Sequence, residues 1–568
     1  MDKNKIISKS KYVAGLQCHK YLWYLINDPK AIPPFDEITQ FRFQQGHDVG
    51  NLAKSLFPGG IDIEYGVDIK AELARAKELT GLAAPAVIVL AADQAAATAN
   101  NSVRPDNTIS SSGSTNTANT STGGISNYIK NTGITNTTIR RPLFEPAFTY
   151  KNAFARADIL EPSGTDAWSI IEVKSASSIK DINKHDISFQ KYCYEGAGLK
   201  IDKCYLMYLN RDFIKDGPID PHQFFTKEDV TGEAEMLQEG VEEKINMMLD
   251  AIKDTSCPEI SISKNCYSPY DCPLKQICWS HLPKNNVFEL YKGKDIAFSL
   301  YRDGIIEISE INETSLLSLS SIQLKQHKAV KENCPIIDRD SIDEFLKKLQ
   351  YPLYFLDFET FATAIPLFDG LRPYQNIPFQ FSCHIMQTPD AEPGNHYFLA
   401  GDDKADPRIG FLESLQNALG YDSNYDNNRS GSPAAGSILV YYESFEKNIL
   451  KELAKLFPDH NRWIEDVIER IVDMYEPFGK FYYYNCWQKG SASLKNVLPA
   501  LTGISYDEME ISNGQMASIR YLNITFLKGE KEPDKAQVEK IRKDLLDYCG
   551  LDTEGMIFIL RKLYKIAD

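Results

Sequence analysis

A glutamate and a lysine, Glu172 and Lys174, stand two residues apart in an apolar run, and Asp158 precedes them. Period-two alternation places Glu172 and Lys174 on one face of a strand, with Ile171 and Val173 on the other. Two carboxylates can hold Mg²⁺ or Mn²⁺, while a lysine ammonium steadies an attacking water or the charge that develops on a phosphate. This pattern predicts metal-assisted hydrolysis of phosphodiester bonds.

A hairpin and a helix must position these groups. Residues 152–160 are expected to form one strand, and residues 168–174 its hairpin partner after a Pro-Ser-Gly turn. Asp158 would then lie across the hairpin from Glu172. The helix that should follow carries Gln190 and Tyr194, which are four residues apart and therefore share one face.

This arrangement resembles the PD-(D/E)XK fold of the RecB nuclease family and is closest to the CRISPR-associated RecB-like exonucleases. The matching residues are Asp158, Glu172-Val173-Lys174 and Gln190-x3-Tyr194. The resemblance implies that these residues are catalytic, that Asp158 and Glu172 bind metal, and that Glu145 is the family's additional metal-binding acid. The family usually carries Gly-x3-His early in the domain, but here Gly50 stands at the histidine position and His47 is out of phase.

Four cysteines form a separate pattern in the first half. Cys266, Cys272 and Cys278 lie in a proline-containing, turn-forming segment, and Cys18 lies far upstream. One early and three late cysteines resemble the iron-sulfur version of this nuclease family, including its AddB relatives, which implies a [4Fe-4S] cluster. The family's usual late spacing has two residues, rather than five, between the first two cysteines. Zn²⁺ is the alternative occupant, with Cys257 as a substitute ligand, and unliganded thiols are a third alternative.

A second acidic pattern opens the other half of the chain. Asp357 and Glu359 interrupt an apolar run from Leu353 and share a face of the expected strand. Burying two carboxylates there is costly unless a cation compensates them. Near the C-terminus, Tyr548 and Asp552 lie one turn apart on an expected helix over residues 536–563.

This order of motifs resembles the DnaQ-like exonucleases of the RNase H superfamily, in the subclass with tyrosine in its third motif. The resemblance implies that two divalent metals are bound by Asp357, Glu359 and Asp552, with Tyr548 positioning the attacking water. In the second motif, Glu446 stands for the family's aspartate, as a further catalytic and metal-binding residue, and Tyr442 stands for its asparagine. Asp473 is the reserve candidate for that acid.

The chain has 568 residues, which is too long for one core, so two domains are expected. The two resemblances imply an α/β class, with a restriction-endonuclease-like domain and an RNase H-like mixed-sheet domain. The expected boundaries are 1–285 for the first, 286–348 for a connecting linker and 349–568 for the second. Residues 84–138 and 421–437 have low-complexity composition and are expected to be loops inserted within the domains. No long apolar run or leader is apparent, so a cytoplasmic location without membrane association is expected.

The net charge of −16 argues against a protein that only coats nucleic acid, because such proteins carry excess lysine and arginine. The favoured function is a DNA nuclease with two separate active sites, acting on ends or single strands in repair, processing or defence, and RNA stays open as a substrate. A nucleic-acid-binding scaffold with one degenerate nuclease domain is the alternative. A metal-stabilised protein-interaction module is a third.

Overall fold

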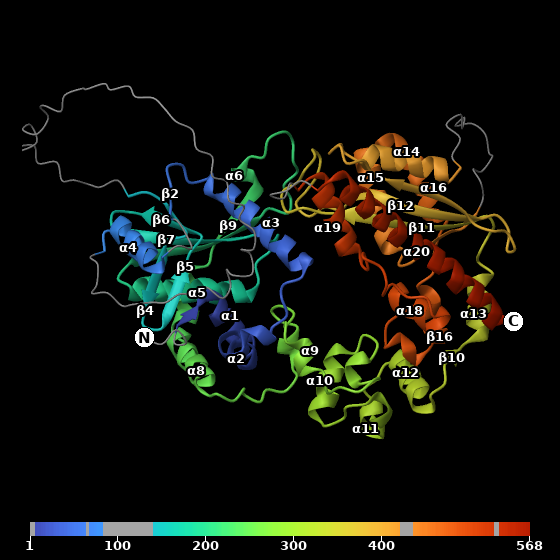
Figure 1. Ribbon diagram of the computed structural model, residues 1–568, viewed down its shortest axis with the longest axis horizontal. Helices are drawn as coiled ribbons and strands as arrows, with labels where there is room; N and C mark the ends of the chain where they lie inside the picture. The colour runs from blue at the N-terminus through green and yellow to red at the C-terminus, as the bar shows by residue number, and fades with distance from the viewer. Residues whose placement is uncertain (1–5, 64–67, 83–139, 421–435, 528–532) are drawn as a thin grey trace, which may run out of the picture.

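The computed structural model describes residues 6–63, 68–82, 140–420, 436–527 and 533–568. These residues form a mixed α/β protein with a large mixed sheet in each half (Figure 1). The low-complexity residues 84–138, and most of 421–437, lie outside the described ranges. Among the described residues, no helix is both long and apolar enough to cross a membrane.

The sheet of the N-terminal lobe has the strand order β2-β3-β6-β7-β8-β9, in which β7 and β8 are parallel and α5 connects them. Helix α5 covers one face of the sheet and α3 lies against β7 on the other. The bounds of these elements are α3 (Glu37–Lys54), β2 (Ile61–Asp62), β3 (Leu143–Phe144), β6 (Ile159–Ser163), β7 (Ala167–Lys174), α5 (Asp181–Gly196), β8 (Lys200–Leu209) and β9 (Phe225–Asp229).

The expected single strand over residues 152–160 is wrong in one respect, because it is two strands in two sheets. Strand β5 (Ala153–Arg156) belongs to a small sheet with β1 (Ile7–Ser8) and β4 (Ala147–Tyr150), whereas β6 joins the large sheet. The backbone N–H of Ala157 donates to the buried Tyr194 hydroxyl at 2.8 Å instead of to a neighbouring strand. The chain therefore changes sheets at Ala157 and Asp158.

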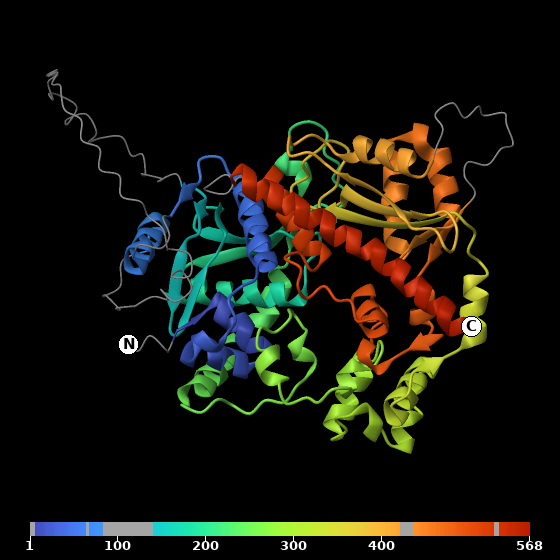
Figure 2. The ribbon, with the colours of Figure 1, turned by 45° about the vertical axis from the view of Figure 1, so that its right-hand side comes forward.

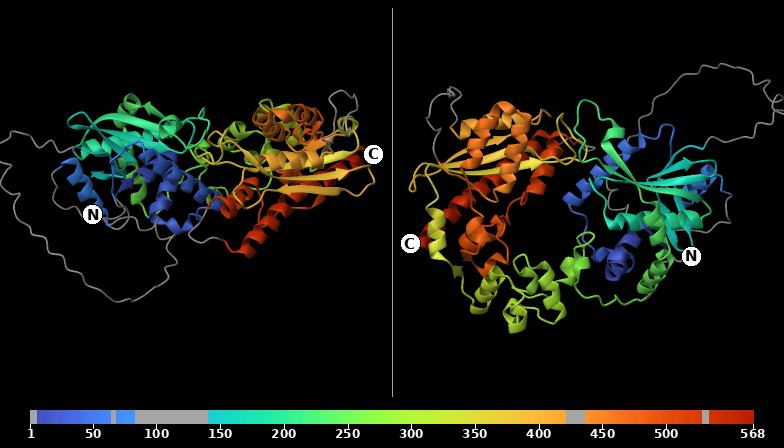
Figure 3. Two further views of the ribbon diagram at one scale, coloured as in Figure 1. Left: turned by 90° about the horizontal axis from the view of Figure 1, so that it is seen from above. Right: turned by 180° about the vertical axis from the view of Figure 1, so that it is seen from behind.

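The C-terminal sheet has the order β13-β12-β11-β14-β15, with β11 at its centre. Tyr354, Leu356 and Phe358 pack on one face against α14, α15 and α16, while Leu353 and Phe355 pack on the other among residues of α18, α19 and α20 (Figure 3). Asp357 and Glu359 follow the second alternation and so face α20. The bounds are β11 (Leu353–Phe361), β12 (Ile377–Met386), β13 (Gly394–Leu399), α14 (Arg408–Ala418), β14 (Ile438–Val440), α15 (Ser444–Leu456), α16 (Asn461–Glu469), β15 (Ile471–Asp473), α18 (Leu494–Thr502), α19 (Gly514–Thr525) and α20 (Lys535–Ala567).

The expected linker, residues 286–348, is a helical segment with a small core of its own, which includes Val287, Leu300 and Ile308. It passes from one lobe to the other on the side away from α3 and α19 (Figures 1 and 2). Its strand β10 (Ile336–Ile337) pairs with β16 (Tyr483–Tyr484) of the C-terminal lobe. Its helices are α10 (Lys294–Arg302), α11 (Glu313–Leu316), α12 (Ser321–Glu332) and α13 (Arg339–Leu346).

The two lobes also touch directly, where α3 meets α19. The buried backbone N–H of Ala364 donates to the side-chain oxygen of Gln45 at 2.7 Å. The Tyr374 hydroxyl donates to the carbonyl oxygen of Ser175, the residue after Lys174. These bonds join α3 and the end of β7 to the loop that follows β11.

Candidate functional site

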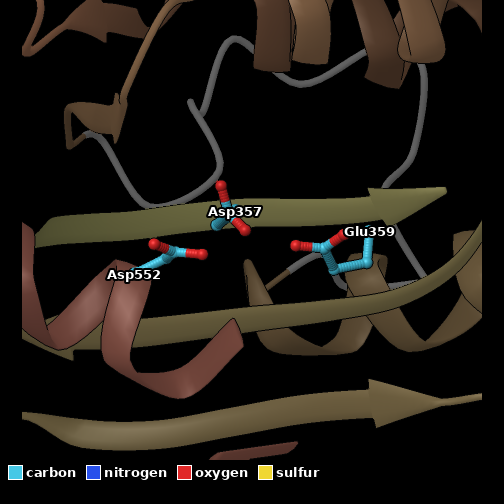
Figure 4. Close-up of side chains that lie close together, drawn as sticks. All are labelled: Asp357, Glu359 and Asp552. Atoms are coloured by element: carbon cyan, nitrogen blue, oxygen red, sulfur yellow. The ribbon is translucent and has the colours of Figure 1, made fainter. Parts of the chain in front are cut away.

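Asp357, Glu359 and Asp552 form a carboxylate cluster between the central strand of the C-terminal sheet and its longest helix. One oxygen from each lies within 4.8 Å of the others, with Asp357 and Glu359 on β11 and Asp552 on α20 (Figure 4). Glu359 and Asp552 are only 6% and 5% exposed. The expected convergence of these three residues is confirmed, because the period of the strand and that of the helix both aim the side chains into the same interface.

Burial and mutual repulsion disfavour charge in this cluster. Burial, followed by repulsion from Asp552, raises the pKa of Glu359 to about 8 and also raises that of Asp357 well above its usual value. Burial raises the pKa of Asp552 to about 6, although a hydrogen bond from Tyr506 opposes the shift. A divalent cation would relieve this repulsion, and an all-oxygen donor set suits Mg²⁺ or Mn²⁺.

Tyr548 lies one turn before Asp552 on α20 and is buried. A hydrogen bond with Tyr548 opposes the rise that burial causes in the pKa of Asp552, and burial beside Asp552 raises the pKa of Tyr548 far above its usual value. The Tyr506 hydroxyl donates to Asp552 Oδ1 at 2.5 Å. Two protonated tyrosines therefore hold the same carboxylate.

Glu446 and Asp473, the two candidates for the second-motif acid, have different surroundings. Glu446 is 1% exposed in the first turn of α15, and its Oε2 has no hydrogen-bond partner. Its charge raises the pKa of both Asp357 and Glu359, although it stands outside the group whose oxygens lie within 4.8 Å of one another. Burial raises the pKa of Glu446 itself to about 8. These features place an unsatisfied acid next to the cluster.

Asp473 instead closes a turn. Its Oδ1 accepts the backbone N–H groups of Tyr442 at 2.8 Å and of Tyr475 at 2.9 Å. Tyr442, which stands for the family's asparagine, has a left-handed backbone with φ of 80° and is 56% exposed. The structure therefore gives Asp473 a local backbone role.

Glu172 in the N-terminal lobe is surrounded by cationic and amide groups. It is 1% exposed, and its Oε1 accepts Lys174 Nζ and Lys9 Nζ, each at 2.7 Å. Its Oε2 accepts Gln190 Nε2 at 2.9 Å. Burial opposes ionisation, but the two lysines outweigh it and hold the pKa of Glu172 far below its usual range. Lys174 also donates to Asp186 at 2.8 Å.

Asp158, Glu145 and Tyr194 lie around this ion-pair network. Asp158 Oδ2 accepts the backbone N–H of Val173 at 2.7 Å, which confirms its place across from β7, and burial followed by Glu172 raises its pKa to about 7. Glu145 lies in a left-handed turn between β3 and β4, not on a strand, and burial raises its pKa. The Tyr194 hydroxyl donates to the carbonyl of Pro146, so it holds backbone beside both acids.

In the part of the chain that the structure describes, the carboxylates of the N-terminal lobe do not form a group of three with oxygens within 4.8 Å. Glu172 already has cationic partners. His47, the out-of-phase histidine, is exposed on α3. The N-terminal lobe thus presents an ion-pair network, whereas the three acids of the C-terminal cluster form no ion pair among the described residues.

The four predicted cysteines, Cys18, Cys266, Cys272 and Cys278, line one small cavity of about 40 Å³. The buried Gln17 side chain donates to the carbonyls of Asn265 and Tyr270 at 2.7 and 2.6 Å, which brings the early cysteine to the late ones. No three of the described thiol sulfurs lie within 4.8 Å of one another, whereas four ligands of one Zn²⁺ are about 3.8 Å apart for a bond of ~2.3 Å. Burial raises the pKa of Cys272 to about 11, and Cys257 lies near enough to Cys278 for the two charges to interact.

Two comparisons relate parts of this chain to other proteins. The family described as "Domain of unknown function (DUF2779)" matches residues 354–493, a span that contains Asp357, Glu359 and Glu446 and ends before Asp552. A protein of Mycoplasma pneumoniae (strain ATCC 29342 / M129 / Subtype 1), "Uncharacterized protein MG366 homolog", is 25% identical over 229 residues. That match covers 38% of this chain and 32% of the other protein, so it spans about a third of the relative's length.

Sequence patterns missed several groups at these sites. Asp186 lies one turn before Gln190 on α5 and accepts its amide at 3.1 Å, so helical spacing was the signal that could have found it. Lys9 reaches Glu172 from the start of the chain, and Tyr506 reaches Asp552 from outside any motif. Lys495 lies 4.9 Å from the centre of the Tyr548 ring. No local spacing links these last three residues to their partners.

Proposed function

We propose that this protein is a divalent-metal-dependent nuclease that hydrolyses phosphodiester bonds in DNA, with its principal active site in the C-terminal lobe. The observation that carries the proposal is the convergence of Asp357, Glu359 and Asp552, which have carboxylate oxygens within 4.8 Å of one another and of which Glu359 and Asp552 are buried. The resemblance to DnaQ-like exonucleases supports it, because the matching motifs lie on the central strand of a mixed sheet and on a long helix that packs against this sheet.

In this proposal the three carboxylates hold Mg²⁺ or Mn²⁺, and Glu446 adds a fourth acid. Two such ions supply Lewis acidity and lower the pKa of a water for attack on phosphorus. Tyr506 and Tyr548 keep Asp552 oriented by hydrogen bonds. Because its pKa is raised, Tyr548 stays protonated at neutral pH and can donate to a water or to a phosphate oxygen.

For the N-terminal lobe we propose a PD-(D/E)XK-type nuclease site built on Asp158, Glu172 and Lys174, with Glu145, Gln190 and Tyr194 around it. Metal binding by Glu172 requires at least one lysine to give up its bond to Oε1. That requirement is the observation behind a second candidate for this lobe, in which the lysine-rich network binds the nucleic acid without cutting it. The cysteine cavity would hold a [4Fe-4S] cluster, since no three of its sulfurs stand as close together as the ligands of one zinc ion do.

Cleavage of end-labelled single- and double-stranded DNA and RNA by the full chain, with Mg²⁺, Mn²⁺ or EDTA, tests the proposal. We expect stepwise shortening of a DNA strand that EDTA stops and that Asp552→Asn reduces by at least about 100-fold, since it removes an anionic metal ligand. Asp547→Asn is the matched control, because Asp547 is an exposed acid on the same helix. Equal cleavage by Asp552→Asn and by the wild type would refute the assignment.

The same assay decides between the two views of the N-terminal lobe. If Lys174→Ala removes a cleavage activity that survives in Asp552→Asn, the lobe is a second nuclease. If Lys174→Ala weakens only the binding of the strand, the lobe is a binding domain.

A further inference from the structure

A large pocket opens beside the carboxylate cluster, between the helical segment 286–348 and the C-terminal lobe. Its volume is about 980 Å³, and its lining includes Lys284, Trp487, Lys489, Lys495, Asn496 and Tyr506. We call it the Trp487 pocket. It is formed by the region around α12, β16 and α18, which lie next to one another in Figure 1.

Two residues of this pocket also belong to the surroundings of the cluster. Tyr506 donates to Asp552 at 2.5 Å. Lys495 lies 5.5 Å from the Tyr506 ring centre, and its positive charge opposes the rise that burial causes in the pKa of both Glu359 and Asp552. A ligand that fills the pocket would therefore lie against Tyr506, whose hydroxyl contacts Asp552 of the cluster.

The wall that carries Trp487 is held in a defined shape. Gly490 has φ of 65°, and a Cβ there would lie 1.5 Å from the carbonyl oxygen of Glu289. That carbonyl accepts Gln326 Nε2 at 2.8 Å, and the same amide donates to the Tyr484 hydroxyl at 3.2 Å. Gln326 is 1% exposed, so the segment 286–348 is joined firmly to the turn that presents Trp487.

The chemistry of the lining suits a strand of nucleotides. Trp487 is 65% exposed, and the ammonium of Lys284 lies 5.5 Å from its ring centre. Neither Lys284 nor Lys489 forms an ion pair with any described residue, so both are free to meet phosphates. Glu289, an acid of the lining on which the charge of Lys489 acts, accepts the backbone N–H of Asn285 at 3.1 Å. An aromatic ring between cations matches the stacking platform and charged groove by which proteins bind unpaired strands.

We propose that the Trp487 pocket binds single-stranded nucleic acid, with a base stacked on Trp487, phosphates at Lys284 and Lys489, and the end of the strand at the carboxylate cluster. This inference rests on the proposed nuclease function for the direction of the strand, but the binding can be measured without cleavage. A duplex is excluded from this mode, because its base faces are already stacked.

Binding of fluorescein-labelled oligothymidylate and oligouridylate, about 12 nucleotides long, to the full chain in EDTA tests the pocket by anisotropy. Trp487→Ala should weaken binding about 5- to 150-fold, which corresponds to one stacked base, while Trp487→Phe should stay within about threefold of the wild type. Lys489→Gln should lower the slope of log affinity against log salt by about 0.7. Tyr397→Ala, which removes another aromatic ring that is 61% exposed, should change nothing.

Wild-type affinity in Trp487→Ala, or no binding of either strand by the wild type, would overturn the proposal. The proposal would also be overturned if a matched duplex bound as tightly as the single strands and its binding, too, were unchanged in Trp487→Ala. Cleavage with Mn²⁺ is scored separately: cleavage without dependence on Trp487 refutes only the pocket, and Trp487-dependent binding without cleavage refutes only the nuclease assignment.

Discussion

Individual carboxylates in this protein have different partners, and the partners predict what each replacement does. Glu446 has a buried oxygen without a partner, whereas Asp473 holds two backbone N–H groups. We predict that Glu446→Gln reduces Mn²⁺-dependent cleavage at least about tenfold, since it removes an anionic ligand of the cluster. Asp473→Asn should leave any cleavage rate of the folded protein within about twofold and lower the melting temperature instead. A silent Glu446→Gln together with an inactive, stable Asp473→Asn would reverse the assignment.

A second prediction concerns Glu359 and pH. Burial raises its pKa in the folded protein to about 8, from 4.5 for a free side chain, so the folded state binds the proton more tightly than the unfolded state does. The metal-free protein should therefore lose stability as the pH rises from 4.5 to about 8. Glu359→Gln should raise the melting temperature at pH near 8 in EDTA, and this gain should vanish in acid. Mn²⁺ should stabilise only the wild type, as scanning calorimetry at several pH values would show; a variant that gains as much from Mn²⁺ contradicts the site.

Replacing Glu172 is expected to destabilise the protein, in contrast to replacing Glu359, because the neighbours of Glu172 are cations. Glu172→Ala leaves Lys9 and Lys174 partly buried without their shared acceptor, so we predict a loss of about 2 kcal/mol or more in the free energy of unfolding. Asp166→Ala breaks an ion pair that is exposed at both ends and should cost less than about 1 kcal/mol. Denaturant titration measures both, and equal losses would show that the network does not stabilise the lobe.

At the scale of elements, the cysteines join the turn between helices α1 (Lys9–Gln17) and α2 (His19–Asn27) to the segment around α9 (Lys275–Cys278). We predict that anaerobically purified protein is brown and contains about four iron and four sulfide per chain. Cys272→Ser should remove the colour and lower the melting temperature, since the tie between distant segments is lost. Cys334→Ser, at an exposed cysteine outside the cavity, is the control. Stoichiometric zinc without iron would replace the cluster by a zinc site.

The two lobes are coupled by hydrogen bonds across their interface, and one of these joins the backbone N–H of Ala364 to the side chain of Gln45. Gln45→Ala leaves the buried N–H of Ala364 without its acceptor, which costs about 1 to 3 kcal/mol at the interface. We predict that the calorimetric transitions of the two lobes lie farther apart in this variant than in the wild type. Gln40→Ala, at an exposed position of the same helix, should leave the trace unchanged. An unchanged trace in Gln45→Ala would show that the lobes are coupled elsewhere.

Local sequence periodicity was sufficient for the elements that carry the main motifs. The expected strand at Leu353 and the helix over residues 536–563 are β11 and α20, and their facing positions bring Asp357 and Glu359 to Asp552. The expected helix with Gln190 is α5. Strand and helix periods are properties of neighbouring residues, so they reveal which side chains share a face.

Which faces meet, and which groups surround each acid, depends on contacts between segments that are far apart in the sequence. Lys9 contacts Glu172, which is 163 positions away in the sequence. The Tyr194 hydroxyl accepts the backbone N–H of Ala157 at the point where the strand expected over residues 152–160 passes from one sheet to the other. The segment 286–348, which reads as a linker, forms one wall of the Trp487 pocket. The physical reason is that the packing of distant elements depends on the total apolar surface that many side chains bury together. The spacing of residues within a single element does not determine which other element covers its apolar face.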